Sequence, residues 1–185
     1  SADIVLIYPK TGLDFASSVA PPHALLAVAA PLYKAGYKIR IIDQRTDPDW
    51  RATLDEYLQA DPICVGISTM SGSQIFFAIE AARLVRTKTD GRVPIVWGGT
   101  HPSLMPMQTL ENELVDIVCV GEGEATFSEL VSALQQKRPL SDVNGIGYKD
   151  GGRIALTPPR PLLDIETLLP VPWELIDVSA YIHPD

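Results

Sequence analysis

The feature that most constrains the fold is an alternation of short apolar runs with stretches of helix length, repeated five times along the chain. The apolar runs are rich in Val and Ile and are hydrophobic almost throughout, as expected of strands buried on both faces. The predicted strands are residues 3–9, 38–43, 61–69, 93–99 and 115–123. The predicted helices are residues 21–37, 50–60, 73–89, 107–114 and 124–136. This order predicts an α/β fold with a doubly wound, five-stranded parallel sheet.

Composition excludes several classes of protein. A chain of 185 residues with 46% hydrophobic content is long enough for one α/β domain with a full core. Its net charge of -8 comes without a basic cluster, which argues against a nucleic-acid partner. No apolar run approaches the roughly 20 residues of a membrane span, and the start lacks a signal-peptide pattern. We therefore expect a soluble cytoplasmic protein.

The two cysteines, Cys64 and Cys119, each lie inside a predicted strand. A cysteine in that setting is more often a small buried hydrophobe than half of a disulfide or a metal ligand. We predict that neither carries redox chemistry and that the chain has no metal site of its own.

The chain changes character after about residue 140. Residues 143–156 hold two short apolar runs around a Lys-Asp-Gly-Gly turn, which predicts a β-hairpin. The following segment is rich in proline, which prevents long helices, yet it retains Leu, Trp and Tyr. We divide the chain into a ligand-binding domain at residues 1–140 and a hairpin with a linker at residues 141–185. Residues from about 150 onward should form an interface rather than part of the core of the sheet, with Trp173 and Tyr181 partly exposed.

Polar and glycine-rich stretches follow four of the predicted strands, at the edge where a doubly wound sheet binds its ligands. Glycine lets a bulky ligand approach the main chain, and free amides at helix starts bind anionic or amide groups. Plain turns and helix caps use the same residue types, but four such strand ends together favour a ligand site. The candidate site residues are Pro9, Lys10, Thr11, Gly12, Ser68, Thr69, Met70, Ser71, Gly98, Gly99, Thr100, His101, Gly121, Glu122, Gly123 and Glu124.

Five segments in this order resemble the N-terminal cobalamin (vitamin B12)-binding domain of cobalamin-dependent radical S-adenosylmethionine (SAM) enzymes. They are residues 21–43, 61–74, 94–103, 115–130 and 168–177. The resemblance covers almost the whole chain. It implies a flavodoxin-like (Rossmann-like) fold that binds cobalamin, followed in the parent protein by a radical SAM barrel with a [4Fe-4S] cluster and S-adenosylmethionine.

Two short motifs carry the implied contacts with the cofactor. Cobalamin modules of the methionine-synthase type surround the dimethylbenzimidazole tail with a Ser-x-Leu signature and a Gly-Gly pair. Ser68–Met70 matches the first with Met in place of Leu, and Gly98–Gly99 matches the second. By resemblance, Ser68 hydrogen-bonds the tail base. The two glycines admit that base between strand and helix, where any side chain would collide with it.

The Asp-x-His-x-x-Gly motif, which supplies the histidine under cobalt in methionine-synthase-type modules, is missing. None of His23, His101 and His183 has an Asp two residues before it. The radical SAM family commonly lacks this histidine, so the resemblance implies base-off cobalamin without a His ligand. We interpret His23 as a cap or packing residue. His101 either contacts the corrin amides or orders its own loop.

Other interpretations rest on the acidic residues and on the first loop. Glu122 and Glu124 could bind a hard cation, although their position before a predicted helix favours interaction with its positive end. Asp43 resembles the acid that binds a ribose in dinucleotide folds, but the first loop lacks Gly-x-Gly-x-x-Gly. A flavin- or nucleotide-binding flavodoxin-like domain is one alternative, because residues 10–18 are rich in hydroxyls. A receiver-like signalling module is another, but its acids and lysine are absent from the strand ends.

The sequence does not support catalysis by this chain alone. A radical SAM cluster needs the motif Cys-x-x-x-Cys-x-x-Cys, and only two cysteines are present. By resemblance, the parent protein is a radical SAM methyltransferase or cyclase. The expected partner is therefore a C-terminal radical SAM domain of the same polypeptide.

Overall fold

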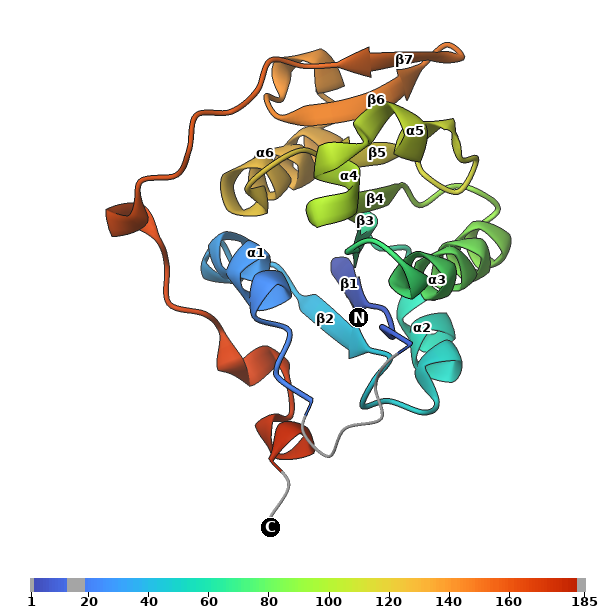
Figure 1. Ribbon diagram of the computed structural model, residues 1–185, viewed down its shortest axis with the longest axis vertical. Coiled ribbons are helices and arrows are strands. Elements are labelled where there is room, and N and C mark those ends of the chain that lie inside the picture. The colour runs from blue at the N-terminus through green and yellow to red at the C-terminus, as the bar shows by residue number, and fades with distance from the viewer. Residues whose placement is uncertain (1, 13–18, 183–185) are drawn as a thin grey trace.

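The computed structural model describes residues 2–12 and 19–182 and is organised around one seven-stranded sheet (Figure 1). The strands are β1 (Ile4–Tyr8), β2 (Ile39–Asp43), β3 (Cys64–Ser68), β4 (Ile95–Gly98), β5 (Ile117–Cys119), β6 (Ile146–Asp150) and β7 (Arg153–Leu156). Their order is β2-β1-β3-β4-β5-β6-β7, with β1 to β5 parallel. The strand order reverses between β1 and β3, so a ligand site is expected beyond the carboxyl ends there. The predicted doubly wound fold is confirmed.

Helices cover both faces of this sheet and bury two apolar cores. They are α1 (His23–Lys34), α2 (Trp50–Leu58), α3 (Ser73–Thr89), α4 (Thr100–Leu104), α5 (Pro106–Glu111) and α6 (Gly123–Gln136). One core packs α1 and α6 against the sheet through residues such as Leu25 and Leu130. The other packs α2, α3 and α5 through residues such as Leu54, Ala82 and Leu110. The helices α1 and α6 therefore lie side by side on one face (Figure 1).

The predicted hairpin is present, but it is not separate from the sheet. Strand β6 pairs antiparallel with β5, placing Ile117 opposite Tyr148, and β7 pairs with β6. The sheet therefore has seven strands rather than the five predicted. Sequence patterns describe each strand singly, whereas the pairing partner of a hairpin depends on which sheet edge is open.

After β7 the chain continues as a strap, residues 158–182, whose helical content is three short 3₁₀ turns. These turns are Ile165–Thr167, Trp173–Leu175 and Val178–Tyr181. The strap runs past α6 and α1 and ends near the carboxyl end of β2 (Figure 1, orange to red). Trp173 is 40% exposed and Tyr181 is half-buried, so the predicted partial exposure is confirmed.

Both cysteines are free and buried, which confirms their interpretation as small core residues. Within residues 2–12 and 19–182, no helix is long and apolar enough to cross a membrane. In the same part of the chain, no group of three His, Cys, Asp or Glu side chains is placed to hold a metal ion. Residues 13–18 of the hydroxyl-rich first loop, and His183, lie outside the described residues.

Candidate functional site

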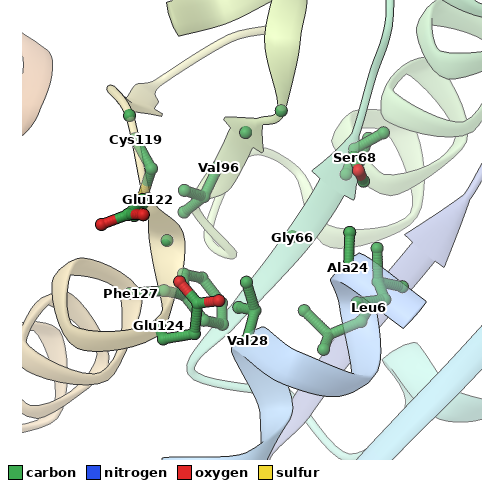
Figure 2. Close-up of a pocket in the computed structure, with 16 residues that line it drawn as sticks. Leu6, Ala24, Val28, Gly66, Ser68, Val96, Cys119, Glu122, Glu124 and Phe127 are labelled. Atoms are coloured by element: carbon green, nitrogen blue, oxygen red, sulfur yellow. The ribbon is translucent and has the colours of Figure 1, made fainter. Parts of the chain in front are cut away.

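A cavity of about 250 Å³ opens between the carboxyl half of the sheet and the helices α1 and α6 (Figure 2). Val96 and Cys119 of the sheet form its base, Val28 of α1 forms one wall, and Phe127 of α6 forms another. Ser68 lies at the end of β3, at the edge of the cavity (Figure 2). The cavity can hold a flat apolar group with one polar contact at its edge.

Two glycines, one in β3 and one at the end of β4, line the cavity. A Cβ on Gly66 would lie 2.7 Å from Cδ2 of Leu6 and 3.3 Å from Cζ of Phe127, so this glycine makes room for its neighbours. A Cβ on Gly98 would have only the Cβ of Cys119 near it, at 3.9 Å. A side chain at Gly98 would therefore fit on its strand and extend into the cavity.

The second glycine of the pair has a different role from the one expected. Gly99 has a φ of +102°, and a Cβ there would lie 2.5 Å from the carbonyl oxygen of Thr69. Gly99 is needed for the close approach of two main chains, because any larger residue would collide with backbone. Of the two glycines, Gly98 is the one whose missing side chain leaves the cavity open.

Hydrogen bonds join the loops after β3, β4 and β5 into one rim. Oγ of Ser103 donates to the carbonyl oxygen of Gly99 (2.7 Å) and accepts from the amide of Gly121 (2.9 Å). The amide of His101 donates to the carbonyl oxygen of Thr69 (3.3 Å). The main chain of His101 thus joins the start of α4 to the segment that follows β3. The hydroxyl of Ser103 fixes the spacing between the two glycine-rich loops.

The family comparison addresses what this arrangement binds. Residues 10–131 match the model of the B12 binding domain. The chain belongs to the B12-binding domain family. The sequence resemblance to a cobalamin-binding domain is thereby confirmed.

Curated relatives of this B12-binding domain are longer proteins. The chain is 31% identical over 183 residues to an uncharacterized methyltransferase of Pyrococcus horikoshii, covering 96% of this chain and 39% of the relative. It is 30% identical over 177 residues to the anaerobic magnesium-protoporphyrin IX monomethyl ester cyclase of Synechocystis sp., covering 94% and 35%. The chain spans little more than a third of the length of these two relatives.

Solved structures share the fold of the B12-binding domain. One is the radical S-adenosylmethionine methyltransferase TsrM from Kitasatospora setae, solved with cobalamin and a [4Fe-4S] cluster bound. Its TM-score is 0.72 at 22% identity, and the match covers 92% of this chain and 31% of that chain. Another is the cobalamin-dependent S-adenosylmethionine radical enzyme OxsB, solved with aqua-cobalamin and S-adenosylmethionine bound. Its TM-score is 0.73 at 23% identity, and the match covers 86% of this chain and 22% of that chain.

The cavity of the B12-binding domain has the features of a site for a flat, mostly apolar group. Its walls are apolar, its base is opened by Gly98, and its edge carries the Ser68 hydroxyl, which suits a planar base with one ring nitrogen to be hydrogen-bonded. Of the residues predicted from the sequence, those that line the cavity are Ser68, Gly98, Gly99, Gly121, Glu122, Gly123 and Glu124. The others lie at the strand ends without lining it: Pro9, Lys10, Thr11, Gly12, Thr69, Met70, Ser71, Thr100 and His101.

Within the described residues, the two glutamates at the start of α6 do not belong to a group of three or more His, Cys, Asp or Glu side chains that could hold a metal ion. Oε2 of Glu122 accepts a hydrogen bond from the amide of Leu163 in the strap (2.7 Å). Glu124 lies in the first turn of α6, where a negative charge interacts favourably with the helix dipole. Figure 2 shows both carboxylates on the α6 side of the cavity.

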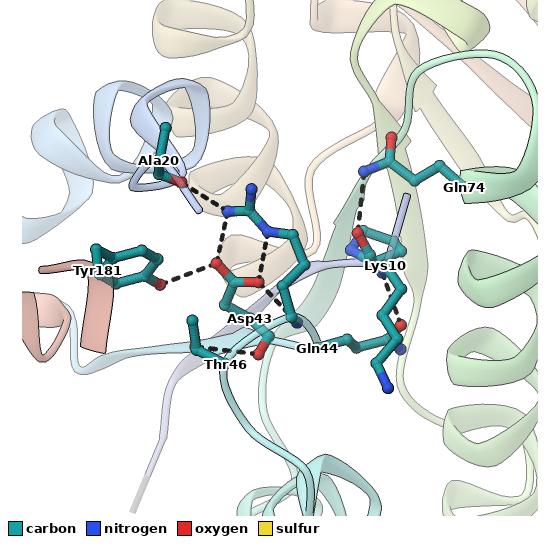
Figure 3. A network of polar contacts seen from close by, with 9 residues as sticks. Lys10, Ala20, Asp43, Gln44, Thr46, Gln74 and Tyr181 are labelled. Atoms are coloured by element: carbon teal, nitrogen blue, oxygen red, sulfur yellow. Dashed lines mark hydrogen bonds and ion pairs between the residues drawn. The ribbon is translucent and has the colours of Figure 1, made fainter. Parts of the chain in front are cut away.

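Two buried glutamines that the sequence analysis missed hold the loop after β1 (Figure 3). Nε2 of Gln74 donates to the carbonyl oxygen of Pro9 (3.0 Å), and its Oε1 accepts from the amide of Met70 (2.6 Å). Oε1 of Gln44 accepts from the amide of Lys10 (3.1 Å). These contacts fix the loop that follows β1 relative to the loop that follows β3.

We expect Gln74→Leu to destabilise the domain. The substitution keeps the volume of the side chain but leaves the carbonyl of Pro9 and the amide of Met70 without their partner. Each unpaired buried group costs about 1–3 kcal/mol. Two such groups cost about 2–6 kcal/mol together, so at about 2–4 °C per kcal/mol for a chain of this size the melting temperature should fall by roughly 4–24 °C. Thermal unfolding measured by circular dichroism, with Gln59→Leu as the exposed control, checks this result. An equal melting temperature for both variants would contradict it.

A buried ion pair closes the carboxyl end of β2 (Figure 3). The guanidinium of Arg45 donates to both carboxylate oxygens of Asp43, at 2.9 and 2.7 Å. It also donates to the carbonyl oxygen of Ala20 (2.9 Å) and stacks 4.1 Å from the ring centre of Tyr8. The hydroxyl of Tyr181 donates to Oδ2 of Asp43 (2.9 Å). Burial, together with Asp43, raises the pKa of Tyr181 to about 12. Both oxygens of Asp43 are thus engaged by side chains of this chain.

Proposed function

We propose that this domain binds base-off cobalamin, with the dimethylbenzimidazole tail in the cavity between the sheet and the helices α1 and α6. The observation that carries the proposal is the apolar cavity opened by Gly98 at the carboxyl edge of the sheet. In this arrangement Ser68 donates a hydrogen bond to the tail base, while Val28 and Phe127 exclude water from its faces.

The absence of a protein histidine under cobalt is the second part of the proposal. The sequence from Pro9 to Pro22, which connects β1 to α1, contains no histidine. His23 packs edge-on against Trp173, with ring centroids 5.0 Å apart, as expected of a packing residue. His101 lies in α4, after β4, and its main-chain amide donates to the carbonyl oxygen of Thr69. These placements favour a cofactor whose lower face receives no imidazole from this chain.

We further propose that the domain presents its cofactor to a radical SAM domain of the same polypeptide. Support comes from the names and lengths of the relatives, which are a methyltransferase and a cyclase much longer than this chain. The parent would bind a [4Fe-4S] cluster and S-adenosylmethionine outside these residues, because Cys64 and Cys119 are both buried in the core. Bound cobalamin supplies a cobalt centre for methyl transfer or for radical-based cyclisation. Two free thiols are consistent with the predicted cytoplasmic location.

Reconstitution with hydroxocobalamin tests the proposal. After desalting, the 185-residue chain should retain corrinoid absorbance. On reduction to the cob(II)alamin state, the electron paramagnetic resonance spectrum should lack the nitrogen splitting of a coordinated base or histidine. Loss of all corrinoid on desalting would contradict cobalamin binding, and clear nitrogen splitting would contradict the base-off state. Retention of flavin mononucleotide in a parallel sample would instead favour the flavodoxin-like alternative.

A further inference from the structure

The strap contacts both helices that form the walls of the cavity. At its start, Arg160 donates to Oγ1 of Thr126 (3.0 Å) and pairs with Glu129, and both partners belong to α6. Leu163 then donates its amide to Glu122 at the beginning of α6. The first part of the strap is thereby attached to one wall of the cavity.

The second part of the strap is attached to the other wall. Trp173 packs edge-on against His23, the first residue of α1. Tyr181 donates to Asp43, whose partner Arg45 also donates to the carbonyl oxygen of Ala20, just before α1. This end of the strap therefore holds the start of α1 to the carboxyl end of β2.

Between these attachments the strap lies over the seam where α1 and α6 meet. A groove there is lined by Ala27 and Pro31 of α1, by Ser128 and Ser132 of α6, and by Leu169 of the strap. The cavity lies beneath the same two helices, with Ala24 and Val28 on one side and Phe127 on the other. A change in the distance between α1 and α6 would alter both the groove and the width of the cavity.

We propose that the strap is a clamp that holds α1 against α6, sets the width of the cavity and thereby limits the rate at which the cobalamin tail leaves. The proposal rests on the proposed function, since it takes cobalamin as the occupant of the cavity. Trp173 and Tyr181 are positioning residues in it, because they act on the cavity only through α1 and β2. Release of the tail needs α1 to move, and that movement has to break their contacts.

The test compares Trp173→Ala/Tyr181→Phe with Leu162→Ala. The double variant removes both contacts at the α1 end, whereas Leu162 is a strap residue that is 87% exposed and serves as the matched control. Each 185-residue chain is loaded with cobalamin, and release is followed by absorbance after adding excess scavenger protein. Loss of an aromatic pair and of a hydrogen bond to a carboxylate should accelerate release roughly tenfold. The control should stay within about twofold of the unmodified chain, the usual range of an exposed substitution.

Hydrogen exchange without cobalamin gives an independent result. Backbone amides of α1 should exchange faster in the double variant, while those of β1 and β3 stay protected. Equal release rates, or unchanged exchange in α1, would overturn the clamp. If the unmodified chain retains no cobalamin, the proposed function fails, and the exchange of α1 still decides whether the strap holds the helix. If the double variant loses its cooperative melting, Tyr181→Phe alone replaces it, with release expected to be about threefold faster because a single hydrogen bond is lost.

Discussion

Replacing Gly98 with Val should strongly weaken cobalamin binding while the domain stays folded. Gly98 lies in the central strand β4, where a β-branched residue is well accommodated, and a Cβ added there would approach only the Cβ of Cys119, at 3.9 Å. The two methyl groups of Val would extend into the cavity, which is lined by Val96, Ser68 and Phe127. Filling a packed site with extra groups costs about 1–3 kcal/mol, so affinity should fall by roughly 5- to 150-fold.

Two further glycine variants serve as controls for this prediction. Gly98→Ala adds only the Cβ, which has room, so it should fold and bind with a smaller loss of affinity. Gly99→Val should instead damage the fold, because its Cβ would collide with the main chain of Thr69 at a φ of +102°. Melting curves and corrinoid retention after desalting distinguish these cases. A Gly98→Val domain that binds cobalamin normally would show that the tail does not lie in this cavity.

The different roles of Gly98 and Gly99 illustrate what the sequence could reveal about the site. The paired glycines after an apolar run marked the correct strand end, because a strand and the loop that follows it are both local features. Which glycine leaves the cavity open depends on the φ angle of Gly99 and on the main chain of Thr69, the residue that follows the neighbouring strand β3. Gly66 left a weaker signal, since a glycine inside a strand indicates close approach of another group without naming Phe127 as its neighbour.

The polar contacts around the site could not be inferred from sequence spacing. Gln74 contacts Pro9 across 65 residues of sequence, and Tyr181 reaches Asp43 across 138 residues. Composition predicted that the strap would pack against a surface, since its Leu, Trp and Tyr residues need cover. Which surface it covers follows only from the folded arrangement, in which the walls of the cavity are α1 and α6.

The largest loss of stability is expected from Asp43→Ala. Asp43 is 5% exposed and neutralises Arg45, whose side chain is 9% exposed. Burial alone disfavours the charged guanidinium, but the hydrogen bonds and the opposite charge of Asp43 outweigh it, so the pKa of Arg45 is raised. Removing one member of a buried pair costs about 3–5 kcal/mol, because the other charge stays buried and unpaired. This is a large part of the roughly 5–15 kcal/mol that stabilises a typical domain.

Denaturant and thermal unfolding show whether the stability lost in Asp43→Ala comes from the unpaired charge of Arg45. Three variants are compared: Asp43→Ala, Asp43→Ala/Arg45→Leu and Asp55→Ala. The double variant should recover a substantial part of the stability, since no unpaired charge remains, although the hydrogen bond from Tyr181 is still lost. Asp55 pairs with Lys88 at the surface, where both side chains are more than 40% exposed, so its removal should cost no more than about 1 kcal/mol. If Asp43→Ala and Asp55→Ala unfold alike, the buried pair does not stabilise this corner. The attachment of the strap through Tyr181 would then lose its basis as well.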